Sequence, residues 1–390
     1  MSKKILIIAG EASSDSHAAS LVKAINSISP DIKFFGIGGK NMQSAGVELL
    51  YNIVNLAVMG PVDLIEHYSK LRKIYYHLCS LAKQNKPDCA ILIDYPGFNL
   101  KIAKYLKALG IPIIYYVSPQ IWAWGAGRIK KIRRLVDKIL VLFSFEEELY
   151  KKEGVKVSFV GHPLLDSVKQ TIQRDKFLTQ LNINPKKTTV GILPGSRNHE
   201  VTRILPIMLD AAKLMQDSLG ADNVEFLLPI ANTIKKDFVK SFLKQRKINI
   251  TLIEGNTYNA LSASYVAMVA SGTATLETAL LGIPMAIVYR VAMLTYLLLR
   301  AVIRIPYIGM VNVMSGKKIV PEFVQYNAKG RLIAEYLLEL IRNKDRWQEV
   351  KNSILEIKPK LGSPGASTRA AEEVVNFLKK AKVCGNPSRI

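Results

Sequence analysis

The chain of 390 residues carries 54 lysines and arginines against 31 aspartates and glutamates, a formal net charge of +23. Hydrophobic residues make up 49% of the chain, which excludes a disordered protein, and the length predicts two or three domains. Three scattered cysteines exclude a disulfide framework and offer no zinc-site spacing. The positive charge favours an anionic partner, namely nucleic acid, a lipid surface or a phosphorylated substrate.

The first half of the chain alternates short apolar runs with longer helical patterns. Nearly continuous apolar runs are typical of strands in a parallel sheet that is covered on both faces. Strands are predicted over residues 4–9, 33–37, 89–93, 113–117, 139–143 and 156–160. Helices are predicted over residues 14–28, 61–82 and 98–109.

The second half repeats this alternation. Strands are predicted over residues 189–193, 225–229, 250–253, 266–270 and 285–289, and helices over residues 201–217, 234–246 and 274–281. The pattern predicts an α/β protein with two Rossmann-like doubly wound domains that face a cleft. We expect the domains to cover residues 1–170 and 171–365, with residues 366–390 forming a C-terminal helix and tail that pack back on the first domain. Neither a signal peptide nor a membrane-spanning helix is expected.

The first strand leads into a turn of small and acidic residues, GEASSD at 10–15. Gly10 allows a tight turn, and Ser13, Ser14 or Asp15 can cap the following helix. The free N–H groups of such a turn could hold an anion, although an ordinary capped turn predicts the same residues. The pattern is not G-x-G-x-x-G, so a dinucleotide site is not supported.

A carboxylate follows the strand at 89–93, where Asp94 precedes a turn that contains Pro96 and Gly97. A carboxylate at the end of a strand can act as a general base, and it can equally well cap the next helix. The spacing leaves both roles open.

Two of the three tryptophans, Trp122 and Trp124, follow the strand at 113–117 and precede the basic segment 128–134. A buried tryptophan is more often a packing residue than a recognition residue. Two tryptophans at a strand end, followed by clustered cations, favour an amphiphilic ligand or an interface.

Two loops of the second half are suited to phosphate. The first, LPGSR at 193–197, offers backbone N–H groups, the Ser196 hydroxyl and the Arg197 guanidinium, but it does not match a P-loop. The second, SGT at 271–273, opens a helix. Glu277 lies one turn inside that helix, where it could accept hydrogen bonds from sugar hydroxyls or simply complement the helix dipole. No compact cluster of metal-type ligands occurs, so a required metal is not expected.

These motifs, together with others in the same order, resemble the lipid-A-disaccharide synthase family. The matching segments are GEAS-x-D at 10–15, LAVMG at 56–60, D-x-P-x-FN at 94–99, YVSP-x-x-WAW at 116–124, GHP at 161–163, LPGSR-x-x-EV at 193–201, SGTATLE at 271–277, YR at 289–290 and PE-x-x-Q at 321–325. Two positions depart from the family pattern. Ser14 stands where the family usually has glycine, and Gly97 stands where an acid is frequent.

The resemblance implies an inverting glycosyltransferase with the two-domain GT-B architecture and no cofactor. Such an enzyme joins UDP-2,3-diacylglucosamine to 2,3-diacylglucosamine 1-phosphate (lipid X) and releases UDP. It implies that the first domain binds the acceptor and the second domain binds the UDP-sugar. Asp94 is the first choice for the catalytic base and Glu11 the second.

The same resemblance assigns the remaining site residues. On the UDP-sugar side they are Ser196, Arg197, Ser271, Gly272, Thr273, Glu277, Asn312 and Gln325, of which Asn312 is expected to follow a strand-like run. On the acceptor side they are Ser13, Asp15, Asn99, Trp122 and Trp124.

Acylated substrates and a basic chain favour peripheral attachment to the cytoplasmic face of the inner membrane. The helix at 61–82 and the apolar run at 291–299 have basic neighbours and are the candidate contacts, although either could be a core helix. A homodimer is compatible with the resemblance, and a nucleic-acid partner is not expected because no binding module is found. Two rivals stay open, a GT-B enzyme that acts on a soluble sugar and a basic nucleic-acid-binding protein.

Overall fold

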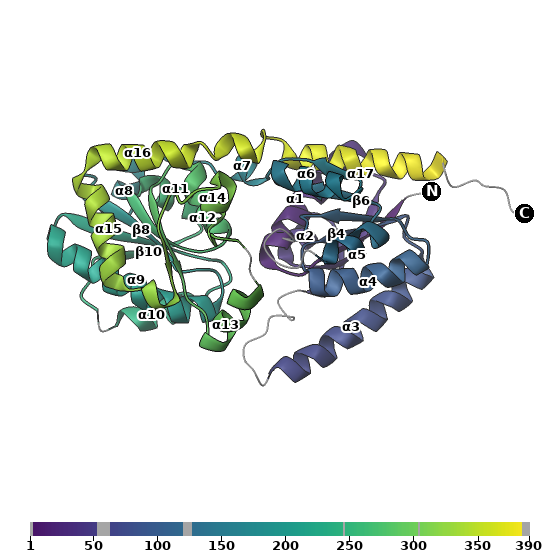
Figure 1. Ribbon diagram of the computed structural model, residues 1–390, viewed down its shortest axis with the longest axis horizontal. Coiled ribbons are helices and arrows are strands. Elements are labelled where there is room, and N and C mark those ends of the chain that lie inside the picture. Colours follow the sequence, from purple (N-terminus) through teal and green to yellow (C-terminus); the bar gives the residue numbers. More distant parts are fainter. Residues whose placement is uncertain (1–2, 53–62, 120–126, 245, 303–304, 384–390) are drawn as a thin grey trace, which may run out of the picture. The chain divides into compact units, whose positions relative to one another are not determined.

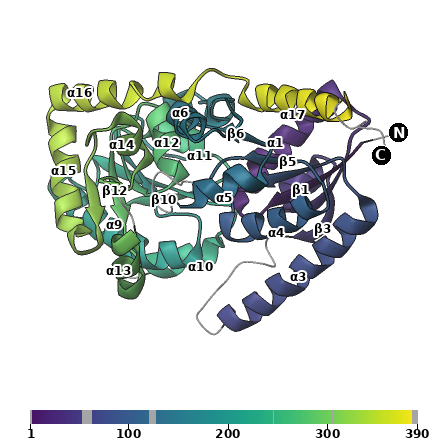
Figure 2. The ribbon, with the colours of Figure 1, turned by 45° about the vertical axis from the view of Figure 1, so that its right-hand side comes forward.

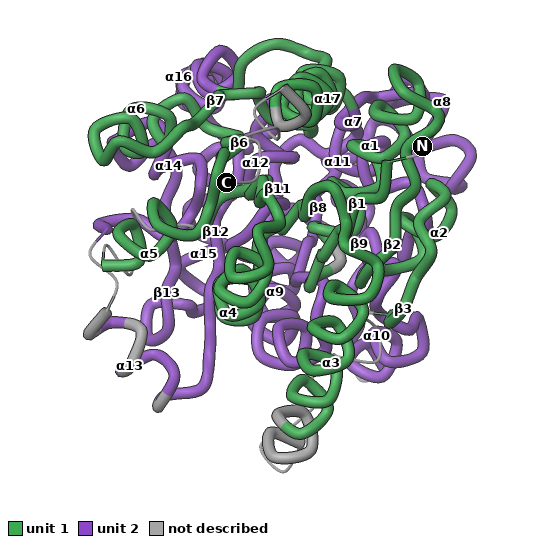
Figure 3. The backbone as a smooth tube through the Cα atoms, turned by 90° about the vertical axis from the view of Figure 1, so that its right-hand side faces the viewer, with its two compact units in different colours: residues 1–166, 361–390 green, residues 167–360 purple. Residues whose placement is uncertain are grey.

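The computed structural model describes residues 3–52, 63–119, 127–244, 246–302 and 305–383. The chain forms two compact units, Met1–Asp166 with Leu361–Ile390, and Ser167–Lys360 (Figure 3). The chain therefore leaves the first unit once and returns to it at its C-terminal end. Each unit is built on one parallel sheet with helices around it, which confirms the predicted α/β class (Figure 1).

The sheet of the first unit has seven strands in the order β3-β2-β1-β4-β5-β6-β7. They are β1 (Lys4–Ala9), β2 (Lys33–Gly38), β3 (Glu48–Asn52), β4 (Cys89–Ile93), β5 (Ile113–Tyr116), β6 (Lys138–Val141) and β7 (Val157–Phe159). All six predicted strands of this half are confirmed. The prediction missed β3, because this edge strand is exposed or half-buried along its length and lacks an apolar run.

Helices cover both faces of this sheet (Figure 2). They are α1 (Ala12–Ile28), α2 (Lys40–Ser44), α3 (Asp63–Asn85), α4 (Pro96–Ala108), α5 (Arg128–Leu135), α6 (Ser144–Lys152), α7 (Leu164–Ser167) at the crossing between units, and α17 (Ala366–Val383). Residues of α3, α4 and α5 share one hydrophobic core with alternate residues of the strands. Helix α17 packs along α1, so the last helix belongs to the first unit.

The second unit has a six-stranded parallel sheet in the order β10-β9-β8-β11-β12-β13. Its strands are β8 (Thr188–Leu193), β9 (Val224–Ile230), β10 (Ile250–Glu254), β11 (Val266–Ala270), β12 (Met285–Tyr289) and β13 (Glu322–Val324). Its helices are α8 (Arg174–Gln180), α9 (Asn198–Leu219), α10 (Lys236–Leu243), α11 (Thr257–Ala263), α12 (Thr273–Leu280), α13 (Met293–Val302), α14 (Met310–Ser315), α15 (Gly330–Arg342) and α16 (Lys344–Leu355). The five predicted strands are confirmed, and the short, half-buried edge strand β13 was missed.

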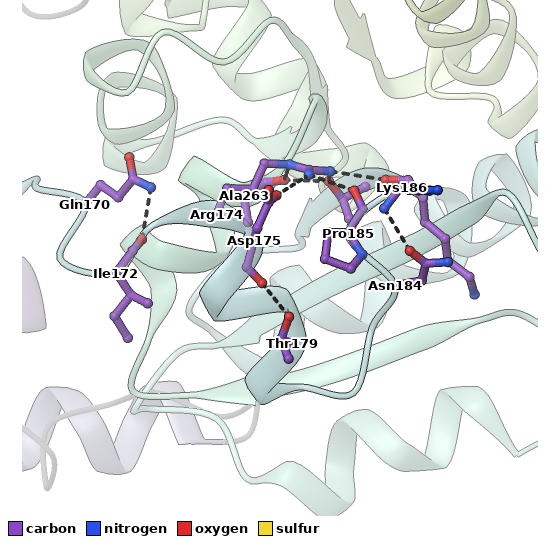
Figure 4. A network of polar contacts seen from close by, with 11 residues as sticks. Gln170, Ile172, Arg174, Asp175, Thr179, Asn184, Pro185, Lys186 and Ala263 are labelled. Atoms are coloured by element: carbon purple, nitrogen blue, oxygen red, sulfur yellow. Dashed lines mark hydrogen bonds and ion pairs between the residues drawn. The ribbon is translucent and has the colours of Figure 1, made fainter.

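Arg174 holds the beginning of the second unit together (Figure 4). Its guanidinium donates to the carbonyl oxygens of Pro185 at 2.8 Å, Lys187 at 3.1 Å and Ala263 at 3.3 Å. A planar guanidinium has five donors, so one side chain can satisfy several carbonyl groups. Arg174 thereby ties α8 and the loop before β8 to the end of α11.

The helix predicted over residues 61–82 is α3, although residues 61–62 lie outside the described part of the chain. From Leu71 onward its apolar face is part of the core, where Leu78 and Ala82 are buried. The basic residues Lys70 and Arg72 are exposed. For this part of α3, the core interpretation is therefore the correct one. Among the described residues, no helix has both the length and the apolar character that crossing a bilayer requires.

Candidate active site

Each sheet has one point where the chain reverses its direction of progress along the strand order. In the first unit this point lies between β1 and β4, and in the second unit it lies between β8 and β11. Ligands of open α/β sheets bind outside the carboxyl ends of the strands at such points. Glu11 and Asp94 follow β1 and β4, and the loops that contain Arg197 and Gly272 follow β8 and β11. The fold thus brings the predicted loops of each unit together in pairs.

The turn that carries Asp94 is strained and firmly held. Asp94 and the next residue, Tyr95, have φ angles of +48° and +44°, which are rare for residues other than glycine. The Asp94 N–H lies 3.2 Å from the Val117 carbonyl oxygen, and the Asp94 carbonyl oxygen accepts from the Tyr115 hydroxyl and, at 2.7 Å, from Asn99 Nδ2. Strained residues that the surroundings hold in place are concentrated at functional sites.

The Asn99 side chain hydrogen-bonds the backbone of the Asp94 turn. It is fully buried in α4 and donates to the carbonyl oxygens of Ile93 and Asp94, at 3.1 and 2.7 Å. The prediction placed Asn99 on the acceptor side. In the structure its amide nitrogen instead fixes the Asp94 backbone, which makes it a positioning residue for that carboxylate.

The Glu11 turn contacts the Asp94 turn directly. A Cβ atom on Gly10 would collide with the Tyr95 ring, so only glycine lets the two turns approach this closely. Burial raises the pKa of the Tyr95 phenol, and the charge of Glu11 raises it further. The two candidate bases therefore follow neighbouring strands, and the Tyr95 ring of the Asp94 turn packs against the Glu11 turn.

Asp15 has a different role from the predicted one. Its buried carboxylate accepts hydrogen bonds from the backbone N–H groups of Gly39 at 2.7 Å, Met42 at 3.1 Å and Asn41 at 3.1 Å. It therefore holds the first turn of α2 and neither caps α1 nor faces an acceptor. Contacts between residues so far apart in sequence are not visible in a local pattern.

The other members of this group differ in accessibility. Ser13 is exposed in the first turn of α1 and stays a candidate for contact with the acceptor. Ser14, which replaces the family's usual glycine, is buried within α1 and has no positive φ, so the serine fits without backbone strain. Trp122 and Trp124 lie outside the described residues.

Two histidines form a pair at the same edge of the first sheet, and their contact was not identified from the sequence. The rings of His17 in α1 and His162 after β7 meet edge to face with centroids 5.9 Å apart. Burial lowers the pKa of His17 to about 4 and that of His162 to about 3, with the neighbouring His17 adding to the second shift. The backbone N–H of His162 donates to the Leu361 carbonyl oxygen at 2.9 Å, where the chain re-enters the first unit.

In the second unit, the loop after β8 already holds an anionic group of the chain itself. Glu200 Oε2 accepts from the backbone N–H groups of Ser196 at 3.0 Å and Arg197 at 3.2 Å, and its Oε1 lies 3.1 Å from Arg197 Nη1. Gly195 makes this possible, because it has a φ of +112° and a Cβ atom there would lie 2.5 Å from Glu200 Oε2. The loop can therefore present two N–H groups and a guanidinium to the oxygens of one anion.

The loop after β11 opens helix α12. Gly272 has a φ of +150°, and Thr273 is exposed at the first position of the helix. The Ser271 hydroxyl donates to the Ile308 carbonyl oxygen at 3.0 Å, so this hydroxyl anchors the loop. Glu277 lies one turn further on and accepts from the Tyr258 hydroxyl at 3.1 Å, and burial raises the pKa of its carboxyl group.

Asn312 and Gln325 were predicted as sugar contacts, and the structure gives both another role. Asn312 does not follow a strand but lies inside helix α14. Its fully buried amide donates through Nδ2 to Val320 and Glu322 and accepts through Oδ1 from the N–H groups of Ile319 and Val320. Gln325 Oε1 accepts from the Val291 N–H at 3.1 Å, and Gln325 Nε2 donates to the Val291 carbonyl oxygen at 2.9 Å. Both N–H donors and both acceptor positions of the Asn312 amide are thus used within the unit. The side chains of Asn312 and Gln325 fix the backbone next to β13 and β12, respectively.

The first unit also has a groove of about 680 Å³ at the opposite end of its sheet from the candidate bases. It is lined by Lys4, Lys33 and Glu48 at the amino ends of their strands and by Phe34 and Leu50. Because the candidate bases follow the carboxyl ends of the strands, this groove is separate from the candidate site. No group of three or more metal-type side chains is found in the described part of the chain.

Comparisons with known proteins agree over nearly the whole chain. The family described as lipid-A-disaccharide synthetase matches residues 5–374. The lipid-A-disaccharide synthase of Syntrophus aciditrophicus is 46% identical over 384 residues, which cover 97% of this chain and 99% of that protein. S. aureus MnaA, solved with UDP, is similar with a TM-score of 0.65 at 15% identity over 100% of both chains. The calicheamicin glycosyltransferase CalG4 is similar with a TM-score of 0.61 at 11% identity over 97% of this chain and 98% of CalG4. At such identities these structures show the fold, the two Rossmann-like units of GT-B proteins.

Proposed function

The chain belongs to the lipid-A-disaccharide synthase family, and we propose how its residues carry out the reaction of that family. The enzyme is a glycosyltransferase of lipid A biosynthesis. It condenses UDP-2,3-diacylglucosamine with lipid X to give the β(1→6)-linked tetraacyl disaccharide 1-phosphate and UDP. The observation that carries this conclusion is the family match across residues 5–374.

Asp94 is the general base in our proposal. Its carboxylate takes the proton from the 6-hydroxyl of lipid X while that oxygen attacks the anomeric carbon of the donor sugar. The bond from this carbon to the UDP oxygen breaks, and its electron pair leaves with UDP, which inverts the anomeric configuration. A positioned base accelerates such a step by about 10²–10⁴. The hydrogen-bonded backbone of Asp94 supports this role, and Glu11, in the turn after the neighbouring strand, is the alternative.

The second unit binds UDP in this proposal. Arg197 and the backbone N–H groups of Ser196 and Arg197 hold diphosphate oxygens, and the first turn of α12 at Thr273 adds further donors. The support is that these donors already hold the carboxylate of Glu200. The nucleotide would take the place of that carboxylate, and Glu277 would accept hydrogen bonds from the ribose.

The two units divide the substrates between them. We assign lipid X to the first unit, which carries Asp94 and Glu11, and the UDP-sugar to the second unit, which carries the anion-binding loops. Titrating UDP into an Arg197→Ala variant and lipid X into a Ser13→Ala variant would test this division, because each change should weaken only one ligand. A homodimer stays a prediction, which sedimentation equilibrium would test.

We further propose that the enzyme attaches peripherally to the cytoplasmic face of the inner membrane. Helix α13 supports this, because Met293 and Leu297 are 44% and 52% exposed, and Tyr326, whose hydroxyl contacts Met293 Sδ, is 64% exposed. The exposed arginines Arg290 and Arg300 flank this apolar patch. Each cation near an anionic lipid surface contributes about 1 kcal/mol to binding.

Vesicle sedimentation tests the membrane contact. Leu297→Gln should reduce binding to phosphatidylglycerol vesicles. Leu214→Gln, a matched change at a 43% exposed leucine of α9, should leave binding unchanged. Equal binding by both variants and the wild type would remove α13 from the membrane contact.

The reaction itself is tested with purified protein, UDP-2,3-diacylglucosamine and lipid X in detergent without added metal. Mass spectrometry should detect the disaccharide 1-phosphate and UDP. A folded protein that binds UDP and forms no product would point to another acceptor, as the soluble-sugar rival requires. A protein that binds RNA or DNA with a steep salt dependence, and does not bind UDP, would contradict the assignment.

A further inference from the structure

Tyr258 connects two parts of the second unit. It is the second residue of α11, and its hydroxyl donates to Glu277 Oε1 in α12 at 3.1 Å. The side chain of Ser167, the first residue of this unit, hydrogen-bonds the same phenol. Three segments therefore meet at one phenolic oxygen, namely the entry of the chain into the unit, α11 and α12.

The electrostatics fix the direction of the hydrogen bond between Tyr258 and Glu277. Burial and the adjacent Glu277 charge raise the pKa of the Tyr258 phenol, so it stays protonated and always has a proton to donate. The hydrogen bond from Tyr258 lowers the pKa of Glu277 and partly offsets the effect of burial. The phenol thus stabilises the ionised form of a carboxylate that its surroundings would otherwise disfavour.

The geometry leaves most of the accepting capacity of Glu277 unused by Tyr258. An ionised carboxylate can accept about four hydrogen bonds, and Tyr258 uses one of them on Oε1. The adjacent hydroxyls of a ribose are two donors that one carboxylate can accept together. A glutamate has several rotatable bonds, and fixing its carboxylate beforehand removes part of the entropy that binding would otherwise lose.

We propose that Tyr258 is a positioning residue that presents the Glu277 carboxylate to the ribose hydroxyls of a uridine nucleotide. The inference rests on the proposed function, since it needs Glu277 to bind ribose. Tyr258 itself does not touch the nucleotide. It holds the carboxylate in its ionised form and in one orientation, and the side chain of Ser167 hydrogen-bonds the same phenol.

The test compares two ligands by isothermal titration calorimetry. UDP and 2′-deoxy-UDP are titrated into the wild type, Tyr258→Phe, Glu277→Gln and the control Tyr265→Phe. Tyr265 is a tyrosine of the same unit that stacks on Trp347. We expect Tyr258→Phe to weaken UDP binding about three- to tenfold, the range for one hydrogen bond. We expect it to weaken 2′-deoxy-UDP binding by a smaller factor, because that nucleotide keeps only the 3′-hydroxyl as a donor to Glu277, and we expect the control to bind both ligands as the wild type does.

The ratio of the two affinities separates this inference from a structural role. A general loosening of α11 would weaken both ligands equally and overturn the inference. If Glu277→Gln keeps the wild-type preference for UDP, the ribose role of Glu277 fails, and the inference fails with it. If Glu277→Gln loses that preference but Tyr258→Phe keeps it, the ribose role stands and only the inference about Tyr258 fails.

A second variant covers the case in which Tyr258→Phe does not fold. Ser167→Ala removes the hydrogen bond to the phenol and leaves the contact with Glu277 in place. It should reduce the preference for UDP in the same direction by a smaller factor. An unchanged preference in a folded Ser167→Ala protein would contradict the support from Ser167 and, if Tyr258→Phe is unfolded, the inference as a whole.

Discussion

The two units carry different chemistry at equivalent edges of their sheets. In the first unit, positive φ angles fall on the non-glycine residues Asp94, Tyr95 and Val117, at +48°, +44° and +59°. In the second unit, the loops after β8 and β11 have theirs on Gly195 and Gly272, at +112° and +150°, and the non-glycine Gln325, at +52°, follows only the edge strand β13. A non-glycine residue in this region costs on the order of 1–3 kcal/mol, whereas glycine adopts it readily. The loop after β4 therefore carries a carboxylate side chain on a strained backbone. In the second unit, the glycines of the loops after β8 and β11 allow a ligand to approach the backbone.

The largest expected effect tests the side-chain chemistry of the first edge. Asp94→Asn should reduce kcat by about 10²–10⁴, because the amide cannot accept the proton of the acceptor hydroxyl. UDP affinity should not change, since we assign UDP to the other unit. Steady-state kinetics with both substrates and calorimetry with UDP check this.

Glu11→Gln serves as the matched change in the turn after the neighbouring strand. A large loss of kcat in Glu11→Gln together with an active Asp94→Asn protein would transfer the role of base to Glu11. A loss of UDP affinity in either variant would contradict the division of substrates between the units.

The second prediction concerns pH and the histidine pair of the first unit. The pKa values of about 4 for His17 and about 3 for His162 lie below the ordinary value of 6.5. The unfolded chain therefore binds more protons below pH 6.5, and stability is lost as the pH falls from about 6.5 towards 4. The loss should be on the order of a few kcal/mol.

Urea unfolding at several pH values checks this second prediction. His162→Gln should show a shallower loss of stability between pH 6.5 and 4 than the wild type. Glu277 in the second unit has the opposite sign, because its raised pKa makes acid favour the folded state. An identical pH profile in the wild type and His162→Gln would contradict the assignment of the acid sensitivity to this pair.

The third prediction tests the backbone and charge chemistry of the second edge. Arg197→Ala should weaken UDP binding by roughly ten- to a hundredfold, the value of one or two charge-assisted hydrogen bonds. Arg203→Ala, a change at an exposed arginine of α9, is the control and should leave UDP affinity unchanged. Equal affinities in both variants would remove Arg197 from the diphosphate site.

The residues at these edges also show what local sequence patterns can predict. Buried strands and the loops after them, including those of Asp94, Arg197 and Gly272, were located from apolar runs and turn residues. The roles of Asp15, Asn312 and Gln325 were not, because each side chain bonds backbone groups of another element. The histidine pair was missed for the same reason, since α1 brings His17 to a residue that lies far along the chain.

The smallest expected effect is on stability, and it is tested by replacing one glycine in each unit, Gly195 in the loop after β8 and Gly97 in the first turn of α4. Gly195→Ala should destabilise the second unit by at least about 1 kcal/mol, because an alanine disfavours the φ of +112° and its Cβ would collide with Glu200. Gly97→Ala in α4 should be neutral or stabilise the first unit by up to about 1 kcal/mol, since nothing lies within 4 Å of the added Cβ. Chemical denaturation of both variants measures the difference. If Gly195→Ala were as stable as Gly97→Ala, the close approach of Glu200 would not depend on glycine. The contrast between a strained side-chain edge and a glycine-based backbone edge would then lose its structural basis.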